Sequence, residues 1–148
     1  MKWKVKFFIF SISLVMVIAF AGCTKLCTSG YEGNNCNTES RLKFEGVWNA
    51  IDTPGNLTYP DTIAAGGNIS ALTLSGAFAW HYFSHSINAV ASGNTITISL
   101  QQPDSALYMV QGTGTINNKQ STISWSYQLI NAVDSLHVIS NFAGTWTR

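Results

Sequence analysis

The sequence of 148 residues is poor in charged residues, in proline and in cysteine. Only 10% of its residues are charged, and it contains three prolines and three cysteines. No segment shows a convincing helical period of apolar residues, whereas Thr, Ser, Asn, Ile and aromatic residues are plentiful, which favours strands and turns. The length allows one domain and a targeting segment, and the composition predicts that this domain is all-β.

Basic charge is scarce in the part of the chain that we expect to fold. The formal net charge is +1, but Lys2, Lys4 and Lys6 lie in a segment that we expect to be removed. Without these three, five basic residues remain against seven Asp and Glu, which gives a net charge of −2. Nucleic acids require a basic surface, so we expect no nucleic-acid partner.

Catalytic and nucleotide-binding signatures are also missing. The sequence has no Gly-x-Ser-x-Gly elbow, its carboxylates show no paired spacing, and we expect no free thiol. Gly112 and Gly114 lie within a predicted strand with no helix following, so we expect them to relieve crowding or bend a sheet rather than to bind a phosphate. We therefore expect a non-enzymatic protein without a cofactor.

The histidines do not predict a metal site. His81 and His85 lie four residues apart, which in a strand or loop corresponds to about 13 Å, too far to share a ligand position. The less favoured alternative, a hydrolase, would require His81, His85 or His137 to meet a carboxylate in a cleft.

The N-terminus has the pattern of a signal peptide. Three lysines precede an apolar run from Phe7 to Ala21, which is shorter than the ~20 residues that a bilayer span needs. The run ends in Phe20-Ala21-Gly22-Cys23, which resembles the lipobox of bacterial lipoproteins. This resemblance implies that Cys23 is lipidated on sulfur, becomes the mature N-terminus and is acylated there.

Lipidation would make the bilayer a partner of this chain. Two or three acyl chains, at ~0.8 kcal/mol per buried methylene, hold a small domain on a membrane without a spanning helix. Thr24 replaces the Asp that retains lipoproteins in the inner membrane, so the resemblance implies the outer membrane, on its periplasmic or surface face. The alternatives are a secreted protein cut near Ala21 and an uncleaved anchor.

The other two cysteines, Cys27 and Cys36, form an even pair in an exported chain, which predicts a disulfide. The segment from Cys27 to Cys36 resembles the last loop of an EGF-like module. The resemblance implies that Gly30 and Gly33 permit a tight loop and that Tyr31 packs over the bridge. It covers ten residues, so no calcium site or receptor role follows, and the segment is either a stiff spacer or an inert remnant.

Two similar stretches mark the ends of the folded part, Phe44-Glu45-Gly46-Val47-Trp48 and Phe142-Ala143-Gly144-Thr145-Trp146. In a strand, the Phe, Gly and Trp of each copy point the same way. If the copies pair antiparallel with Gly46 opposite Gly144, each Trp lies near the other copy's Phe. We therefore predict that the first and last strands join and close a barrel.

Between these ends the sequence predicts a series of short strands. A weaker candidate from Leu57 to Ala65 contains Pro60, which suits an edge strand or a loop. Further candidates follow, and three of them have predicted inward faces: Ile96, Ile98, Leu100; Tyr108, Val110, Gly112, Gly114, Ile116; and Ile123, Trp125, Tyr127, Leu129. Seven or eight antiparallel strands favour a barrel, with a β-sandwich as the alternative.

Phe44-x-Gly46-x-Trp48 resembles the Gly-x-Trp signature on the first strand of lipocalins, and Arg148 resembles the late arginine that packs across that Trp. The order of lipobox, Gly-Tyr-Glu-Gly-x-x-Cys loop and strand series also resembles small lipoproteins of Bacteroidota. These resemblances imply a lipocalin-like (calycin-like) barrel at residues 41–148, after a signal peptide at 1–22 and a disulfide-bridged neck at 23–40.

The best candidate for a contact surface is the aromatic stretch from Phe78 to Phe83, together with His81 and His85. Stacking and hydrogen bonding together suit a glycan or a small apolar molecule, and the predicted ligand-binding residues are Trp80, His81, Tyr82 and His85. The alternative is that these aromatics fill the core. The leading hypothesis is an envelope lipoprotein that binds a small apolar or glycan ligand or a partner protein; its oligomeric state is not predicted.

A second hypothesis, which we call the outer-surface hypothesis, places the function of the protein on the outside of the barrel. If large side chains fill the interior, the protein would be a structural or adhesion module that acts through its outer surface. The side chains concerned are Trp48, Trp125, Tyr127 and Trp146.

Overall fold

The computed structural model of the chain describes residues 26–76, 83–104, 107–134 and 137–148. The expected signal segment, the lipidation site Cys23 and the predicted ligand-binding residues Trp80, His81 and Tyr82 lie outside these residues. The described part confirms the all-β prediction and decides between its two architectures.

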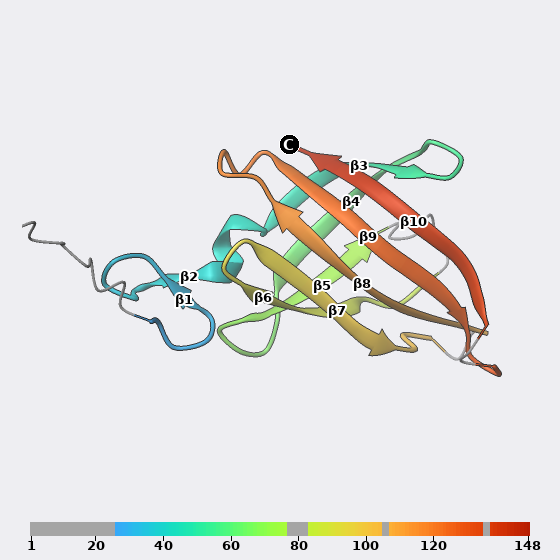
Figure 1. Ribbon diagram of the computed structural model, residues 1–148, viewed down its shortest axis with the longest axis horizontal. Helices are drawn as coiled ribbons and strands as arrows, with labels where there is room; N and C mark the ends of the chain where they lie inside the picture. Colours follow the sequence, from blue (N-terminus) through green and yellow to red (C-terminus); the bar gives the residue numbers. More distant parts are fainter. Residues whose placement is uncertain (1–25, 77–82, 105–106, 135–136) are drawn as a thin grey trace, which may run out of the picture.

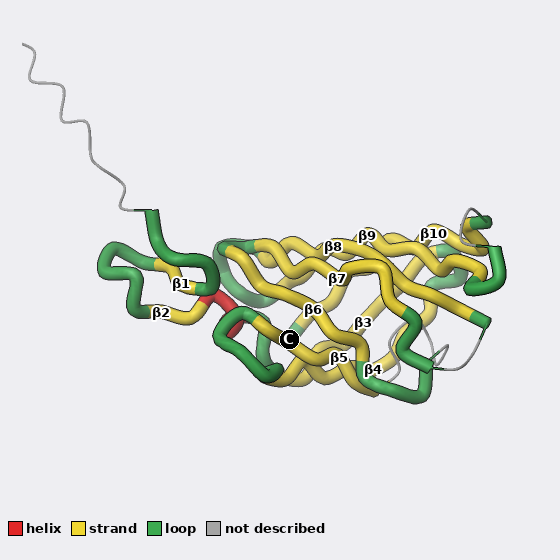
Figure 2. Tube along the Cα trace, turned by 90° about the horizontal axis from the view of Figure 1, so that it is seen from below, coloured by secondary structure: helices red, strands yellow, loops and turns green. Residues whose placement is uncertain are grey.

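The main body is a closed antiparallel barrel of eight strands, which excludes the sandwich (Figures 1 and 2). Each strand pairs with the next along the chain, and the last pairs with the first. The strands are β3 (Gly46–Thr53), β4 (Leu57–Ala65), β5 (Ala71–Gly76), β6 (Ile87–Ser92), β7 (Thr95–Gln101), β8 (Tyr108–Ile116), β9 (Thr122–Asn131) and β10 (Val138–Thr147).

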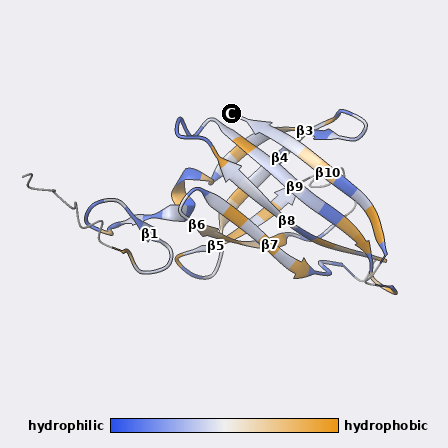
Figure 3. Ribbon diagram, in the orientation of Figure 1, coloured by the Kyte–Doolittle hydropathy of each residue, from blue (hydrophilic) through white to orange (hydrophobic). Residues whose placement is uncertain are grey.

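The strands form where apolar and polar residues alternate, because alternate side chains point into and out of the barrel. In β9, Ile123, Trp125, Tyr127 and Leu129 are all buried, as predicted, while Ser124 and Ser126 are exposed. The same alternation appears as bands along the strands in Figure 3. The apolar core therefore lies inside the barrel.

The predicted pairing of β3 with β10 is confirmed, but the predicted register is wrong. Gly144 lies opposite Asp52, not Gly46, and Trp146 lies opposite Ala50. One reason is that Ser40–Lys43 forms the short 3-10 helix η1, so Phe44 precedes the strand rather than lying in it. The other is steric: a Cβ atom at Gly144 would overlap the carboxylate of Asp52, so glycine is the residue that fits opposite this acid.

Two local predictions are also wrong. Strand β4 is not an edge strand, because the closed barrel has no edges; Pro60 points outward and pairs with Asn49. Leu100, expected inside, is 50% exposed. The pairing of β7 with β8 shifts register between Ile98 and Gln101, and such an irregularity disturbs the inward and outward alternation.

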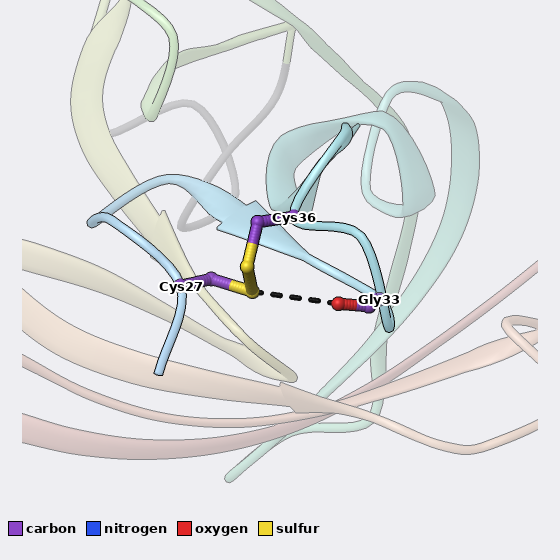
Figure 4. Close-up of a disulfide and its surroundings, with 3 residues drawn as sticks. All are labelled: Cys27, Gly33 and Cys36. Carbon is purple, nitrogen blue, oxygen red and sulfur yellow. Dashed lines mark hydrogen bonds between the residues drawn. A yellow bond between two sulfur atoms is a disulfide. The ribbon is translucent and has the colours of Figure 1, made fainter. Parts of the chain in front are cut away.

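The neck is a small hairpin of β1 (Tyr31–Glu32) and β2 (Thr38–Glu39). The predicted disulfide between Cys27 and Cys36 is present, with a Cα–Cα distance of 5.2 Å, and Cys27 Sγ lies 3.4 Å from the carbonyl oxygen of Gly33 (Figure 4). Gly30 and Gly33 have φ angles of +91° and +84°, a region that glycine enters without strain.

The neck packs against one end of the barrel, which we call the neck end. It carries the β4–β5, β6–β7 and β8–β9 connections, and the opposite end, the far end, carries the other connections (Figure 1). The ammonium group of Lys43 lies 2.5 Å from Glu32 in the neck and 2.8 Å from Asn94 in the β6–β7 turn. Arg41 donates to the carbonyl of Asn68 at 3.1 Å. Lys43 and Arg41 belong to the 3-10 helix η1, so these contacts join the neck and η1 to the barrel.

Candidate functional site

The described interior of the barrel is filled by its own aromatic side chains. Trp48, Trp125, Tyr127 and Trp146 are each at most 3% exposed. The ring centroids of Trp125 and Trp146 are 5.1 Å apart, and Tyr127 stacks on Phe142 at 4.9 Å. This is the arrangement that the outer-surface hypothesis requires.

Gly114 shows how tightly this interior is packed. A Cβ atom at Gly114 would lie 2.8 Å from the Trp125 ring and 2.9 Å from Ile96, closer than side-chain atoms approach. The indole therefore covers the glycine opposite it on the neighbouring strand. The expectation that this glycine relieves crowding is confirmed.

At the neck end, Phe44 and Trp48 are fully buried and Arg148 packs on the Trp48 ring. The guanidinium carbon of Arg148 lies 4.4 Å from the centroid of the Trp48 ring, which confirms the predicted packing of the late arginine. Arg148 also donates to the carbonyl oxygens of Glu45 at 2.7 Å and Lys43 at 2.9 Å. The C-terminal residue thus ties together the start of β3 and the end of β10.

Asp52 organises a polar cluster inside the barrel. This fully buried carboxylate accepts hydrogen bonds from Tyr59 Oη, from Tyr127 Oη at 2.6 Å and from Trp146 Nε1 at 3.3 Å. Burial is the main cause that raises the pKa of both tyrosines, and their contact with Asp52 adds to it, so both keep the proton they donate. Sequence reasoning missed this cluster, although the inward phase of Asp52 in β3 was a signal.

Asp61 is the second buried acid, and its situation is different. It is 1% exposed, and neither carboxylate oxygen accepts a well-formed hydrogen bond from the described residues. Burial raises the pKa of Asp61 to about 8; Asp52 adds to the shift, while the N–H groups of Thr62 and Ser75 oppose it. Asp61 is therefore mainly protonated at neutral pH, as a neutral acid in an apolar core.

The far end contains the one predicted ligand-binding residue that the structure describes. His85 Nδ1 lies 2.6 Å from Asp104 Oδ1, and the imidazole is 73% exposed. Asp104 also accepts the backbone N–H groups of Ser84 at 2.7 Å and His85 at 3.0 Å. The hydrogen bond from the Ser84 N–H is the main cause that lowers the pKa of Asp104. This carboxylate fastens the chain before β6 to the β7–β8 connection.

Ser84, His85 and Asp104 are the residue types of a hydrolase triad, but their hydrogen bonds are not arranged as in a triad. In a triad, one imidazole nitrogen faces the serine and the other faces the acid. Here Ser84 Oγ and Asp104 Oδ1 both lie near Nδ1 of His85, at 3.4 and 2.6 Å, and Ser84 Oγ donates to Asp104 at 3.2 Å. His137 is exposed in the β9–β10 connection. The described geometry of these groups fits a loop clamp.

Metal ligands do not cluster in the described ranges, where no group of three or more His, Cys, Asp or Glu side chains could hold an ion. Within the same ranges, no helix has the length and apolar character to span a bilayer.

The outer surface of the barrel wall carries no charged side chain. The eight strands contain two charged residues, Asp52 and Asp61, and both point inward. Over β7 to β10 the outward residues are mainly hydroxyl and amide side chains that face one another across the strands. One row runs through Thr95, Thr115, Ser124 and Thr145, and a second through Thr97, Thr113 and Ser126.

Two depressions open on this outer surface. The first has a volume of about 440 Å³ and lies over β7 to β10, with Gln111, Thr113, Gln128 and Asn141 among its walls. The second, of about 390 Å³, lies over β5 to β7 and includes Asn88 and Gln101. Thr97 and Ser99 line both, so the two depressions meet along β7. This continuous neutral surface is the candidate functional site.

No protein-family model, curated protein or solved structure matches the chain.

Proposed function

We propose that the protein is a membrane-tethered, non-enzymatic binding module that works through the outer surface of its barrel. The observation that supports this most strongly is the contrast between a described interior packed with Trp and Tyr and an outer wall with two adjoining depressions. A lipocalin-like fold provides a rigid frame for such a surface, because every strand is paired on both sides.

The tether of this proposal is an acylated Cys23 in the outer membrane. The apolar run and the sequence Phe20-Ala21-Gly22-Cys23 support it. Cys23 lies four residues before Cys27, a span of at most about 14 Å of extended chain. Because the neck is fixed to the neck end, a lipid at Cys23 would place that end at the bilayer and direct the far end away from it.

The absence of catalysis is proposed from the arrangement around His85. Ser84 and His85 are exposed, and with the half-buried Asp104 they form a clamp in which the acid accepts most of the hydrogen bonds. The imidazole does not bridge the serine and the acid through its two nitrogens, because both groups lie at Nδ1. The second cluster of acid and tyrosines is buried in the core, out of reach of a substrate.

Native mass spectrometry of the full chain, extracted from its host membrane in a mild detergent, tests the proposal. We expect the mass of the mature polypeptide from Cys23 with its acyl chains and no further apolar molecule. A stoichiometric apolar ligand that survives several preparations would show that the barrel interior carries cargo, and would contradict an exterior working surface. A Cys23→Ser variant should leave the membrane fraction; if it stays there, the tether is wrong.

A further inference from the structure

The outer surface over β5 to β10 has a chemistry that selects one class of ligand. We propose that it binds an uncharged polysaccharide chain, laid across the strands through the two adjoining depressions. This inference rests on the proposed function, since it names the ligand of that outer surface.

Charge excludes the other polar polymers. No Lys, Arg, Asp or Glu side chain projects from the outside of β5 to β10, so neither a phosphate or carboxylate polymer nor a cationic peptide finds a counter-charge there. The polar side chains of the lining are neutral hydroxyls and amides, which both donate and accept hydrogen bonds, and the rest of the lining is apolar or glycine. Sugar hydroxyls have the same dual character, so a neutral glycan is the complementary polymer.

The amides of the first depression are held in place before a ligand arrives. Gln111 donates to Gln128 at 2.9 Å, and Gln128 donates to Asn141 at 2.8 Å, so three strands carry one continuous amide ladder. These bonds use one N–H of Gln111 and one of Gln128. Further amide donors and acceptors therefore remain at fixed orientations, with the carbonyl of Gln111 at one end and the amino group of Asn141 at the other.

The second depression is built in a related way. Gln101 donates to the carbonyl of Asn88 at 2.7 Å and accepts from its N–H at 2.9 Å. The backbone pairing of β6 and β7 runs from Val90 with Thr97 to Ser92 with Thr95. The Gln101 side chain therefore bonds to β6 beyond the end of this backbone pairing. The strands separate there, and the depression lies beside this separation.

The dimensions suit a chain rather than a single sugar. Neighbouring strands lie about 4.8 Å apart, so the path from β5 to β10 covers roughly 24 Å along the barrel surface, enough for several sugar rings. The two depressions share Thr97 and Ser99 on this path.

A protein partner fits the same surface less well. Protein interfaces are anchored by exposed Trp, Tyr and Arg side chains. Among the described residues, the outward positions of β7 to β10 include none of these three types. The exposed apolar side chains at the depressions are Leu100 in the first and Val90 in the second.

The test uses the full lipidated chain, reconstituted in fluorescent phosphatidylcholine vesicles and applied to an array of polysaccharides. The array carries neutral polymers (dextran, mannan, xylan and galactan) and anionic polymers (heparin, alginate and polygalacturonate). We expect retention on at least one neutral polymer, competed by the same polymer in solution, and no retention on the anionic ones. Gln128→Ala, which breaks the amide ladder in its middle, should lower retention at least tenfold, and Asn141→Ala should lower it less.

Asn49→Ala is the matched control, because Asn49 is an exposed amide on β3, outside both depressions. It should bind like the wild type, and all three variants should melt within about 3 °C of the wild type. No retention on any neutral polymer, or full retention by both Gln128→Ala and Asn141→Ala, would overturn the inference. Retention on anionic polymers alone, lost in Gln128→Ala, would overturn the ligand class but leave the exterior binding surface. The exterior surface itself is contradicted if native mass spectrometry finds a stoichiometric apolar ligand.

Discussion

The distribution of charged side chains between the inner and outer faces of the barrel wall is the reverse of that in most soluble sheets. Charged side chains normally point to water, yet here both charged residues of the eight strands, Asp52 and Asp61, point into the core, and none points out. The comparison separates two roles. Polar groups inside the wall determine stability, because burying them is costly unless they are paired, whereas polar groups outside remain free to bind.

Within the core, the two acids themselves form a second comparison. Asp52 receives three hydrogen bonds, whereas Asp61 receives no well-formed one from the described residues. The first is a fully satisfied polar centre, and the second stays in the core because it can carry its own proton. Substitutions in the core and on the outer wall test this division between the two faces.

The largest effect is expected from Asp52→Ala. It leaves the hydroxyls of Tyr59 and Tyr127 and the indole N–H of Trp146 without their acceptor, and each buried orphan costs about 1–3 kcal/mol. We expect the free energy of unfolding to fall by about 3–5 kcal/mol in urea titrations followed by tryptophan fluorescence. Tyr127→Phe removes one donor and should cost about 1 kcal/mol; equal losses in the two variants would contradict the central role of Asp52.

Gly144→Ala should have the next largest effect. The new methyl group would overlap the Asp52 carboxylate and force it away from its donors, which we expect to cost about 2–3 kcal/mol of unfolding free energy. In the Asp52→Ala background the same change should cost far less, because the clash has gone. A double-mutant cycle in urea measures this coupling, and additive losses would refute the steric account.

Asp61 should make stability depend on pH. Its pKa is about 8 in the folded protein against an ordinary value of 3.8 for an aspartic acid in water, so between these values the folded state holds a proton that the unfolded state has lost. The contribution of Asp61 to the free energy of unfolding is therefore fully present below pH 4. It declines as pH rises towards 8, by up to about 1.4 kcal/mol per pH unit. Asp61→Asn should remove this decline in urea titrations at pH 5 to 8; an unchanged slope would contradict it.

The smallest effect on stability is expected outside. Gln128→Ala removes two exposed or half-buried amide hydrogen bonds, and we expect less than about 0.5 kcal/mol loss in unfolding free energy. The same urea titration checks this value. A loss comparable with that of Asp52→Ala would mean that the outer amides hold the fold together, and the contrast between the faces would disappear.

The features that depend on local pattern could be predicted from the sequence. The inward faces of β8 and β9 follow from period-two alternation, and the pairing of β3 with β10 follows from the two similar end stretches. The register of that seam could not be found in this way. It depends on the fit of Gly144 against Asp52 and on the η1 helix before Phe44, and both require coordinates.

The candidate site could not be predicted from the sequence. The amide ladder requires that Gln111, Gln128 and Asn141, from three strands, share one row, and the sequence does not state that register. The irregularity after Ile98 that exposes Leu100 has no clear sequence signal either. The cluster around Asp52 likewise joins side chains from four strands, β3, β4, β9 and β10.

The most direct test of a filled interior and an accessible outer face is cysteine labelling of the folded chain. Ala89→Cys places a thiol on the inner face of β6, where Ala89 is 4% exposed, and Ser126→Cys places one on the exposed face of β9. With a maleimide reagent under native conditions, we expect Ser126→Cys to react fully and Ala89→Cys to stay unmodified until the protein is unfolded. Rapid modification of Ala89→Cys in the native state would show an open interior and contradict the account.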